Sequence, residues 1–145
     1  MTDLVRRATD FAREAHDGQT RKGAAQEPYF VHLEEVAAFV ASHGGSDIAV
    51  AAAWLHDTVE DCGVAPEEIE RLFGPEIAAV VDELTDDKSL PKVERKRLQL
   101  ERAHERSADA ALVKIGDKVS NVGAIAASPP LHWDAARSRA YVDWA

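Results

Sequence analysis

Residues 48–55 read IAVAAAWL, an unbroken run of eight apolar residues, and the polar string HDTVED follows directly at residues 56–61. A helix with this run is apolar on every side instead of along one stripe, so we expect it to lie buried inside the protein. Ser46 or Asp47 can cap its first turn. The end of this helix then brings charged groups next to the interior, where an ionised carboxylate costs several kcal/mol unless a cation or hydrogen bonds compensate it.

The rest of the chain also shows helical spacing. Leu4, Ala8, Phe11 and Ala15 recur every three or four residues behind a cap at Thr2, which predicts a first helix ending near residue 16. Further helices are expected at residues 30–42, 67–72, 76–84 and 93–106, then after a cap at Ser107 or Asp109, and finally from residue 133 onward. Ala, Val and Leu dominate the apolar residues, which suits packed helices better than sheets. We therefore predict an all-α fold.

The length of 145 residues, 46% of them hydrophobic, is enough for one compact domain with one core, so we expect residues 1–145 to form a single domain. The last predicted helix is still amphipathic where the sequence stops at Ala145. We therefore expect that a short C-terminal segment of the domain is missing.

The formal net charge of −9 argues against duplex nucleic acid or an anionic membrane as the main partner. A phosphorylated small molecule is still compatible, because a local basic patch aided by a metal ion can outweigh the global sign. The single cysteine, Cys62, excludes an internal disulfide and fits a reducing compartment. Neither a signal peptide nor an apolar run long enough to cross a membrane is found, so we expect a cytoplasmic protein.

The spacing within HDTVED points to chemistry. His56 and Glu60 are four residues apart, as are Asp57 and Asp61, so on a continuous helix each pair lies on one side, about one turn apart. Two of these groups can bind a metal ion while two handle protons. The residues alone leave a second interpretation open, in which the helix ends here, its acids face water and His56 is an ordinary hydrogen-bonded side chain.

His32 and Asp117 are the candidates for further metal ligands, because each lies in a different predicted helix. A solvated face explains Asp117 equally well, since on a helical wheel it falls with Lys114, Lys118 and Asn121, opposite an apolar stripe of Leu112, Ile115, Val119 and Val122. If all four side chains converge, two imidazoles and two carboxylates without a thiolate suit Mn²⁺, Fe²⁺ or another hard divalent ion. Such a set leaves coordination positions open for water and phosphate.

Five motifs in order make the chain recognisable: GQTRKG, PYFVH, WLHDTVED, LTDDKSLPKVERKRLQ and LVKIGDKVSN. From Phe11 to Trp144 the sequence resembles the hydrolase domain of RelA/SpoT-type alarmone enzymes, and most of all the small stand-alone SpoT homologues of animals. The resemblance implies the all-helical bundle of the HD-domain superfamily. It also favours the metal-site interpretation of His56 and Asp57 over the ordinary helix end.

The resemblance implies a role for each of several residues. It assigns one Mn²⁺ ion to His32, His56, Asp57 and Asp117, and catalytic acid–base chemistry to Glu60 and Asp61. It also implies that six more residues contact the substrate. Arg21 and Lys22 would bind the nucleotide, Lys92 and Arg137 would bind phosphates, and Asn121 and Tyr141 would lie near the base and ribose. From the residues alone, the basic side chains among these can equally well belong to a solvated surface.

The family reaction implied for this chain is hydrolysis of the 3′-pyrophosphate of ppGpp or pppGpp, giving GDP or GTP and pyrophosphate. One alternative keeps the enzyme class but changes the substrate, to the 2′-phosphate of NADPH or another phosphorylated nucleotide. A second alternative is a nucleotide-binding sensor that does not turn over. In each case the partner is a small phosphorylated nucleotide.

Three residues depart from the family pattern. Leu33 stands where a proline usually follows the histidine, and Gly116 replaces an alanine before the aspartate. Gly123 occupies a position where an arginine is common. The first two are backbone variations that we expect to be tolerated, whereas the missing cation at Gly123 is expected to weaken the grip on substrate or to change which nucleotide is preferred.

Overall fold

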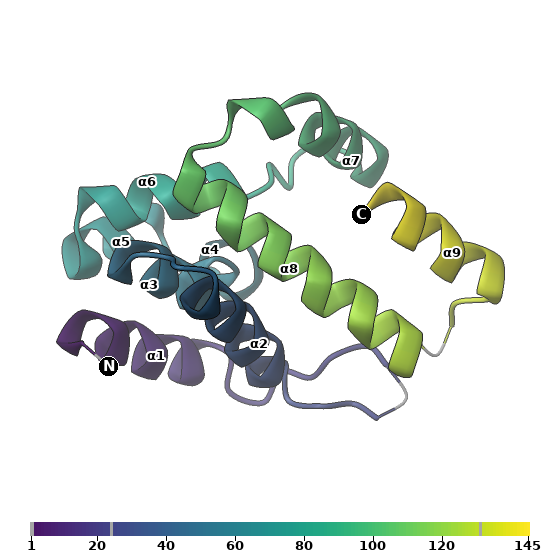
Figure 1. The fold of residues 1–145 in the computed structure, drawn as a ribbon, viewed down its shortest axis with the longest axis horizontal. Coiled ribbons are helices and arrows are strands. Elements are labelled where there is room, and N and C mark those ends of the chain that lie inside the picture. Colours follow the sequence, from purple (N-terminus) through teal and green to yellow (C-terminus); the bar gives the residue numbers. More distant parts are fainter. Residues whose placement is uncertain (1, 24, 131) are drawn as a thin grey trace.

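The structure is a computed structural model that describes residues 2–23, 25–130 and 132–145. The chain forms helices α1 (Asp3–Ala15), α2 (Tyr29–Ser42), α3 (Asp47–Leu55), α4 (Thr58–Cys62), α5 (Pro66–Phe73), α6 (Pro75–Leu84), α7 (Lys92–Glu101), the 3₁₀ turn η1 (Ala103–Glu105), α8 (Ala108–Ala127) and α9 (Ala135–Trp144) (Figure 1). Within the described residues there is no β-strand, so the prediction of an all-α fold is confirmed. Among the same residues, no helix combines the length and the apolar character needed to cross a membrane.

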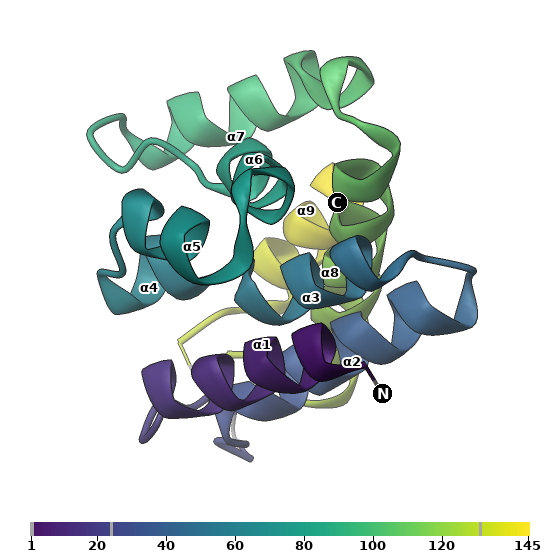
Figure 2. The ribbon, with the colours of Figure 1, turned by 90° about the vertical axis from the view of Figure 1, so that its left-hand side faces the viewer.

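Helix α3 lies at the centre of the fold, as the apolar run predicts. It packs against α1, α2, α6 and α8, and in two perpendicular views it lies between α1 and α6 (Figures 1 and 2). Ala49, Ala51, Ala52, Ala53 and Leu55 are fully buried. The alanines allow the neighbouring helices to approach closely from several sides, which explains why this run needs no polar face.

The predicted cap residues begin the helices that they were expected to begin. The side chains of Thr2, Ser46 and Ser107 each accept a hydrogen bond from a backbone N–H in the first turn of the helix that follows. The last helix begins at Ala135, two residues later than predicted, because Asp134 caps it through the backbone N–H of Arg137.

The helix predicted at residues 93–106 is shorter in the structure. It begins at Lys92, ends at Glu101 and is followed by the separate turn η1. None of its side chains is fully buried, so packing gives little support to a longer helix.

The predicted continuous helix through HDTVED is wrong, since the chain turns at His56 and Asp57 between α3 and α4. The hydroxyl of Thr58 donates a hydrogen bond of 2.8 Å to the carbonyl of Leu55 and so satisfies the end of α3. His56 and Asp57 therefore lie in the turn, while Glu60 and Asp61 lie on α4. The two pairs therefore do not lie on one continuous helix, although the backbone N–H of Asp61 still bonds to the carbonyl of Asp57 and all four side chains line one cleft.

The apolar stripe of α8 is not its buried face. Ile115 and Val119 are each 54% exposed, whereas Gly116, Asp117 and Ser120 are buried, so the open interpretation of Asp117 as part of a solvated face does not hold. A Cβ atom at Gly116 would meet the Phe39 ring at 3.0 Å, so the glycine lets α8 approach α2 closely. The buried face of α8 is therefore the side that carries Val113, Gly116 and Ser120, and not the side that carries Ile115 and Val119.

Replacement of one buried isoleucine tests this packing. Ile77→Ala should lower the free energy of unfolding by about 2–5 kcal/mol, because Ile77 in α6 is 1% exposed and the truncation leaves a cavity. Ile115→Ala is the matched control and should change it by less than about 0.5 kcal/mol. Urea unfolding of both variants measures the difference, and an equally large loss for Ile115→Ala would contradict the orientation of α8.

Candidate metal centre and active site

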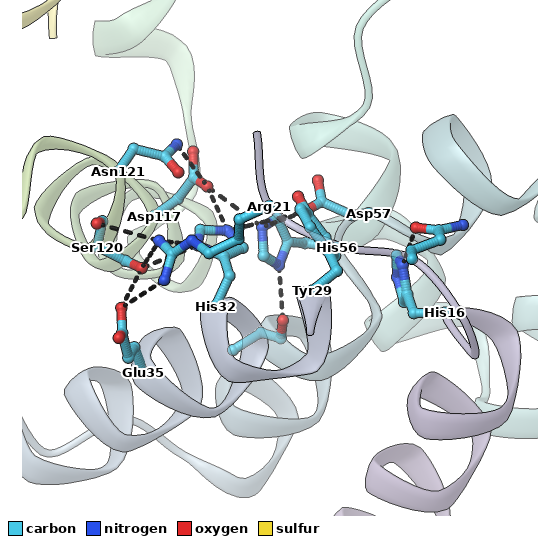
Figure 3. Close-up of polar contacts among 12 residues, drawn as sticks. His16, Arg21, Tyr29, His32, Glu35, His56, Asp57, Asp117, Ser120 and Asn121 are labelled. Carbon is cyan, nitrogen blue, oxygen red and sulfur yellow. Dashed lines mark hydrogen bonds and ion pairs between the residues drawn. The ribbon is translucent and has the colours of Figure 1, made fainter. Parts of the chain in front are cut away.

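Four predicted ligands converge in the interior of the fold. His32 comes from α2, His56 and Asp57 from the turn after α3, and Asp117 from α8, and one potential ligand atom of each lies within 4.8 Å of the others (Figure 3). His32 Nε2 lies 3.1 Å from Asp117 Oδ1, and His56 Nε2 lies 3.1 Å from Asp57 Oδ2. The close packing of α2, α3 and α8 brings these segments together.

The hydrogen bonds of His56 show that this cluster fits a metal ion. Nδ1 lies 2.6 Å from the backbone carbonyl of Ala53, which can only accept, so Nδ1 carries a hydrogen. Nε2 is buried and makes no hydrogen bond among the described residues, although it faces the carboxylates of Asp57 and Asp117 at 3.1 and 3.4 Å. A lone pair and two carboxylates this close require a cation between them, either a metal ion or a proton.

The pKa values of these side chains also reflect the need for a cation in the cluster. Burial alone would lower the pKa of His56, but the nearby charge of Asp57 and contacts with Asp117 outweigh it, and the pKa lies well above 6.5. Burial alone would raise the pKa of Asp57, yet His56 brings it down to about 2. The neighbouring imidazoles of His32 and His56 lower the pKa of Asp117 as well, against the effect of burial. Both carboxylates are therefore ionised at neutral pH.

Two neighbours hold the carboxylates from outside the cluster. The hydroxyl of Tyr29 donates a hydrogen bond of 2.6 Å to Asp57 Oδ2, and the amide of Asn121 donates one of 3.3 Å to Asp117 Oδ1. Tyr29 was not among the predicted site residues, although it lies in the motif PYFVH next to His32. Donors of this kind orient metal-binding carboxylates.

A cleft of about 310 Å³ lies beside the cluster of candidate metal ligands. Glu60 and Asp61 line this cleft together with His56, Asp57 and Asp117. Glu60 accepts a hydrogen bond from the backbone N–H of Asp86 at 2.8 Å, and Asp61 lies 3.5 Å from the ammonium group of Lys88. Burial raises the pKa of both carboxyl groups, and the charge of Asp57 adds to the effect. A raised pKa suits a carboxyl group that exchanges protons near neutral pH.

The six predicted substrate residues line two adjoining hollows. Lys92 and Arg137 line the cleft beside the candidate metal ligands, Arg21 and Lys22 line a second hollow of about 500 Å³, and Asn121 and Tyr141 line both. Arg21 differs from the expectation of a free phosphate-binding side chain. It is only 11% exposed and lies 3.6 and 3.4 Å from the carboxylates of Glu27 and Glu35.

Three lysines in the cleft, Lys96, Lys114 and Lys118, were not predicted as site residues, and the ammonium group of Lys114 lies 3.7 Å from Asp117 Oδ2. The ammonium group of Lys118 lies 3.4 Å from the centre of the Trp144 ring, and that of Lys96 lies 4.9 Å from it. Burial and the neighbouring charge of Lys114 lower the pKa of Lys118 to about 7. On the helical wheel Lys118 falls with Asp117, and the sequence left open whether this side of α8 is a solvated face or faces the site.

Comparison with known proteins shows to which family the chain belongs. The family model of the HD domain matches residues 8–142. The chain belongs to the HD-domain family. The implied fold of that family is thereby confirmed.

The curated relatives include a guanosine-3′,5′-bis(diphosphate) 3′-pyrophosphohydrolase, MESH1, from Xenopus tropicalis, which is 45% identical over 98% of this chain and 80% of its own length. The human protein of the same name is 44% identical over 95% of this chain and 78% of its own length. A solved structure of a metazoan SpoT orthologue, described as hydrolysing ppGpp, matches with a TM-score of 0.95 and 36% identity, covering 99% of this chain and 82% of its own. The resemblance to stand-alone SpoT homologues is confirmed.

Binding of Mn²⁺ should release a proton from the metal-free protein at pH 7. Because the pKa of His56 lies well above 6.5, its imidazole is protonated at this pH, whereas a metal ligand must present a neutral nitrogen. Affinity for Mn²⁺ should therefore rise with pH until His56 is neutral. Calorimetric titration in two buffers of different ionisation enthalpy measures the released proton, and equal heats in both would contradict the prediction.

Proposed function

We propose that this chain is a metal-dependent phosphohydrolase that removes the 3′-pyrophosphate of ppGpp or pppGpp, giving GDP or GTP and pyrophosphate. The observation that carries the proposal is the buried, unpaired Nε2 of His56 facing two carboxylates beside the acid pair Glu60 and Asp61. The names of the relatives and the ppGpp hydrolysis described for the structural neighbour support the substrate. The free thiol of Cys62 fits a reducing compartment, so we place the activity in the cytoplasm.

His32, His56, Asp57 and Asp117 would hold one divalent ion, and the nitrogen and oxygen donors without a thiolate suit Mn²⁺. When bound, such an ion lowers the pKa of a water molecule and offsets negative charge on phosphoryl oxygens. The donors on Tyr29 and Asn121 would keep the two carboxylates in place for it.

Glu60 and Asp61 would act as the general acid and base of the reaction. The oxygen of a water molecule bonds to the phosphorus next to the ribose, the bond from that phosphorus to the 3′-oxygen breaks, and the 3′-oxygen gains a proton. Water loses a proton in the same reaction, so a carboxyl pair can accept one proton and supply the other. General acid–base catalysis of this kind contributes about 10²–10⁴-fold to the rate.

The cations of the two hollows would hold the phosphates. Lys92 and Arg137 line the cleft that contains Glu60 and Asp61, and Lys22 lines the adjoining hollow. Asn121 and Tyr141, which line both, would lie against the ribose and the base. Fixing the polyphosphate in this way orients the phosphorus for attack and neutralises charge as it develops.

Variants at two positions should separate metal binding from catalysis. Asp57→Ala should lose Mn²⁺ and activity together, because a ligand is removed from the cluster. Glu60→Gln should retain Mn²⁺ but lose about 10²-fold or more in kcat, since the amide cannot exchange the proton. Metal analysis and a pyrophosphate-release assay with ppGpp measure both. Glu67→Gln, a change in the first turn of α5, is the control, and a fully active Glu60→Gln protein would contradict the assigned role.

A comparison of substrates tests the reaction itself. With Mn²⁺ present, wild-type protein should release pyrophosphate from ppGpp with a much higher kcat/KM than it releases phosphate from NADPH. Release of phosphate from NADPH at the higher efficiency would show that the 2′-phosphate is the true target. Binding of either nucleotide without any product would show a sensor instead of an enzyme.

Gly123→Arg should lower the KM for ppGpp about tenfold, the effect of one charge-assisted hydrogen bond to a phosphate. Gly123 is exposed in the wall of the larger hollow, and a Cβ atom there would meet nothing within 4 Å beyond its own helix among the described residues, so a side chain fits. Gly123→Gln is the matched control of similar reach without the charge. Steady-state kinetics at low and high salt measure the effect, and an equal gain for both variants would contradict an electrostatic cause.

A further inference from the structure

The hydroxyl of Ser120 makes contacts that none of the assigned roles uses. Its Oγ lies 2.8 Å from His32 Nδ1 and 2.5 Å from Glu35 Oε2, and the guanidinium of Arg21 donates a hydrogen bond of 3.0 Å to it (Figure 3). Ser120 is buried on the face of α8 that packs against α2. A serine in a helix often bonds to the carbonyl four residues earlier, whereas these bonds reach across to another helix.

The short contacts around Ser120 favour one arrangement of hydrogens, and the contact of 3.5 Å between the Arg21 guanidinium and His32 Nδ1 is too long to outweigh them. The ionised carboxylate of Glu35 can only accept, so the hydroxyl of Ser120 donates its single hydrogen to Glu35. Its lone pairs then accept, one from Arg21 and one from His32. His32 therefore carries its hydrogen on Nδ1, and its Nε2 has a free lone pair 3.1 Å from Asp117 and 3.7 Å from Asp57.

Arg21 and Glu35 hold this chain of hydrogen bonds together. The guanidinium of Arg21 bonds to both the hydroxyl and the backbone carbonyl of Ser120 and lies 3.4 Å from Glu35. A side chain that is 11% exposed and held by several partners is better placed to fix its neighbours than to follow a ligand. These contacts explain why Arg21 is not free in the substrate hollow.

We propose that Ser120 and Glu35 are positioning residues that fix the tautomer of His32, so that Nε2 and not Nδ1 is presented to the metal ion. The proposal rests on the metal site proposed above. Ser120 meets His32 at Nδ1 and not at Nε2, and Glu35, which lines the larger hollow, reaches His32 through Ser120, so both act on the cluster through His32. Groups that hold the second nitrogen of a metal-binding histidine in this way typically change metal affinity 10–100-fold when they are removed.

The tautomer of His32 in the metal-free protein is the direct test. In wild-type protein, nitrogen NMR of the imidazole should show hydrogen on Nδ1. In Glu35→Ala the hydroxyl of Ser120 is free to donate to Nδ1, so a substantial share of the Nε2–H tautomer should appear. Glu34→Ala, at an exposed position next to it, is the matched control and should leave the spectrum unchanged. A wild-type His32 with hydrogen on Nε2, or no change in Glu35→Ala, would overturn the proposal.

Affinity for Mn²⁺ tests the consequence. Ser120→Ala should weaken binding about 10–100-fold while the protein stays folded, and Ser120→Thr, which keeps the hydroxyl, should restore most of the affinity. Equal affinity of wild type and Ser120→Ala would overturn the positioning role. If wild-type protein bound no divalent ion, the metal site itself would be refuted, and the tautomer measurement would still decide whether the hydrogen-bond chain exists.

Discussion

Two ionised carboxylates, those of Asp57 and Asp117, share a small and largely buried volume with the imidazoles of His32 and His56. Without a compensating cation, their lost hydration and mutual repulsion would cost several kcal/mol. The segments that supply these groups are α2, α8 and the end of α3, which also form much of the core. Core packing and the electrostatic requirement of the site are therefore satisfied by the same helix contacts, and a cation is the part that completes them.

The sequence was sufficient to predict those features that depend on local patterns. The burial of α3 follows from apolar residues on all sides of one helix, and the helix starts follow from caps such as Thr2, Ser46 and Ser107. The four metal candidates came from residue chemistry together with the order of motifs along the chain. The spacing argument correctly predicted that His56 and Glu60 lie close together, but its premise of one continuous helix was wrong. His56 lies in the turn after α3, and Glu60 lies on α4.

Features that depend on how helices meet were not evident from the sequence. The wheel of α8 favours Ile115 and Val119 as the core face, yet the contact with α2 uses Gly116 and Ser120. The resemblance also assigned Arg21 to the nucleotide, and nothing in the sequence indicated that carboxylates hold its side chain. Glu27 lies in the same loop, but Glu35 is 14 residues away on another element and Ser120 is 99 residues away, so the tertiary structure is needed to reveal that Arg21 is held.

The orientation of α8 connects these observations. Asp117, Ser120 and Asn121 are three and four residues apart, so they lie on one side of the helix and reach the ligand cluster together. Turning this side outward would bury Ile115 and Val119, a gain of about 1.5–3 kcal/mol for each fully buried side chain. It would also remove Asp117 from His32 and His56 and break the contact between Ser120 and His32. The small residues that pack against α2 stabilise the orientation in which α8 completes the site, and the exposed aliphatic residues are its consequence.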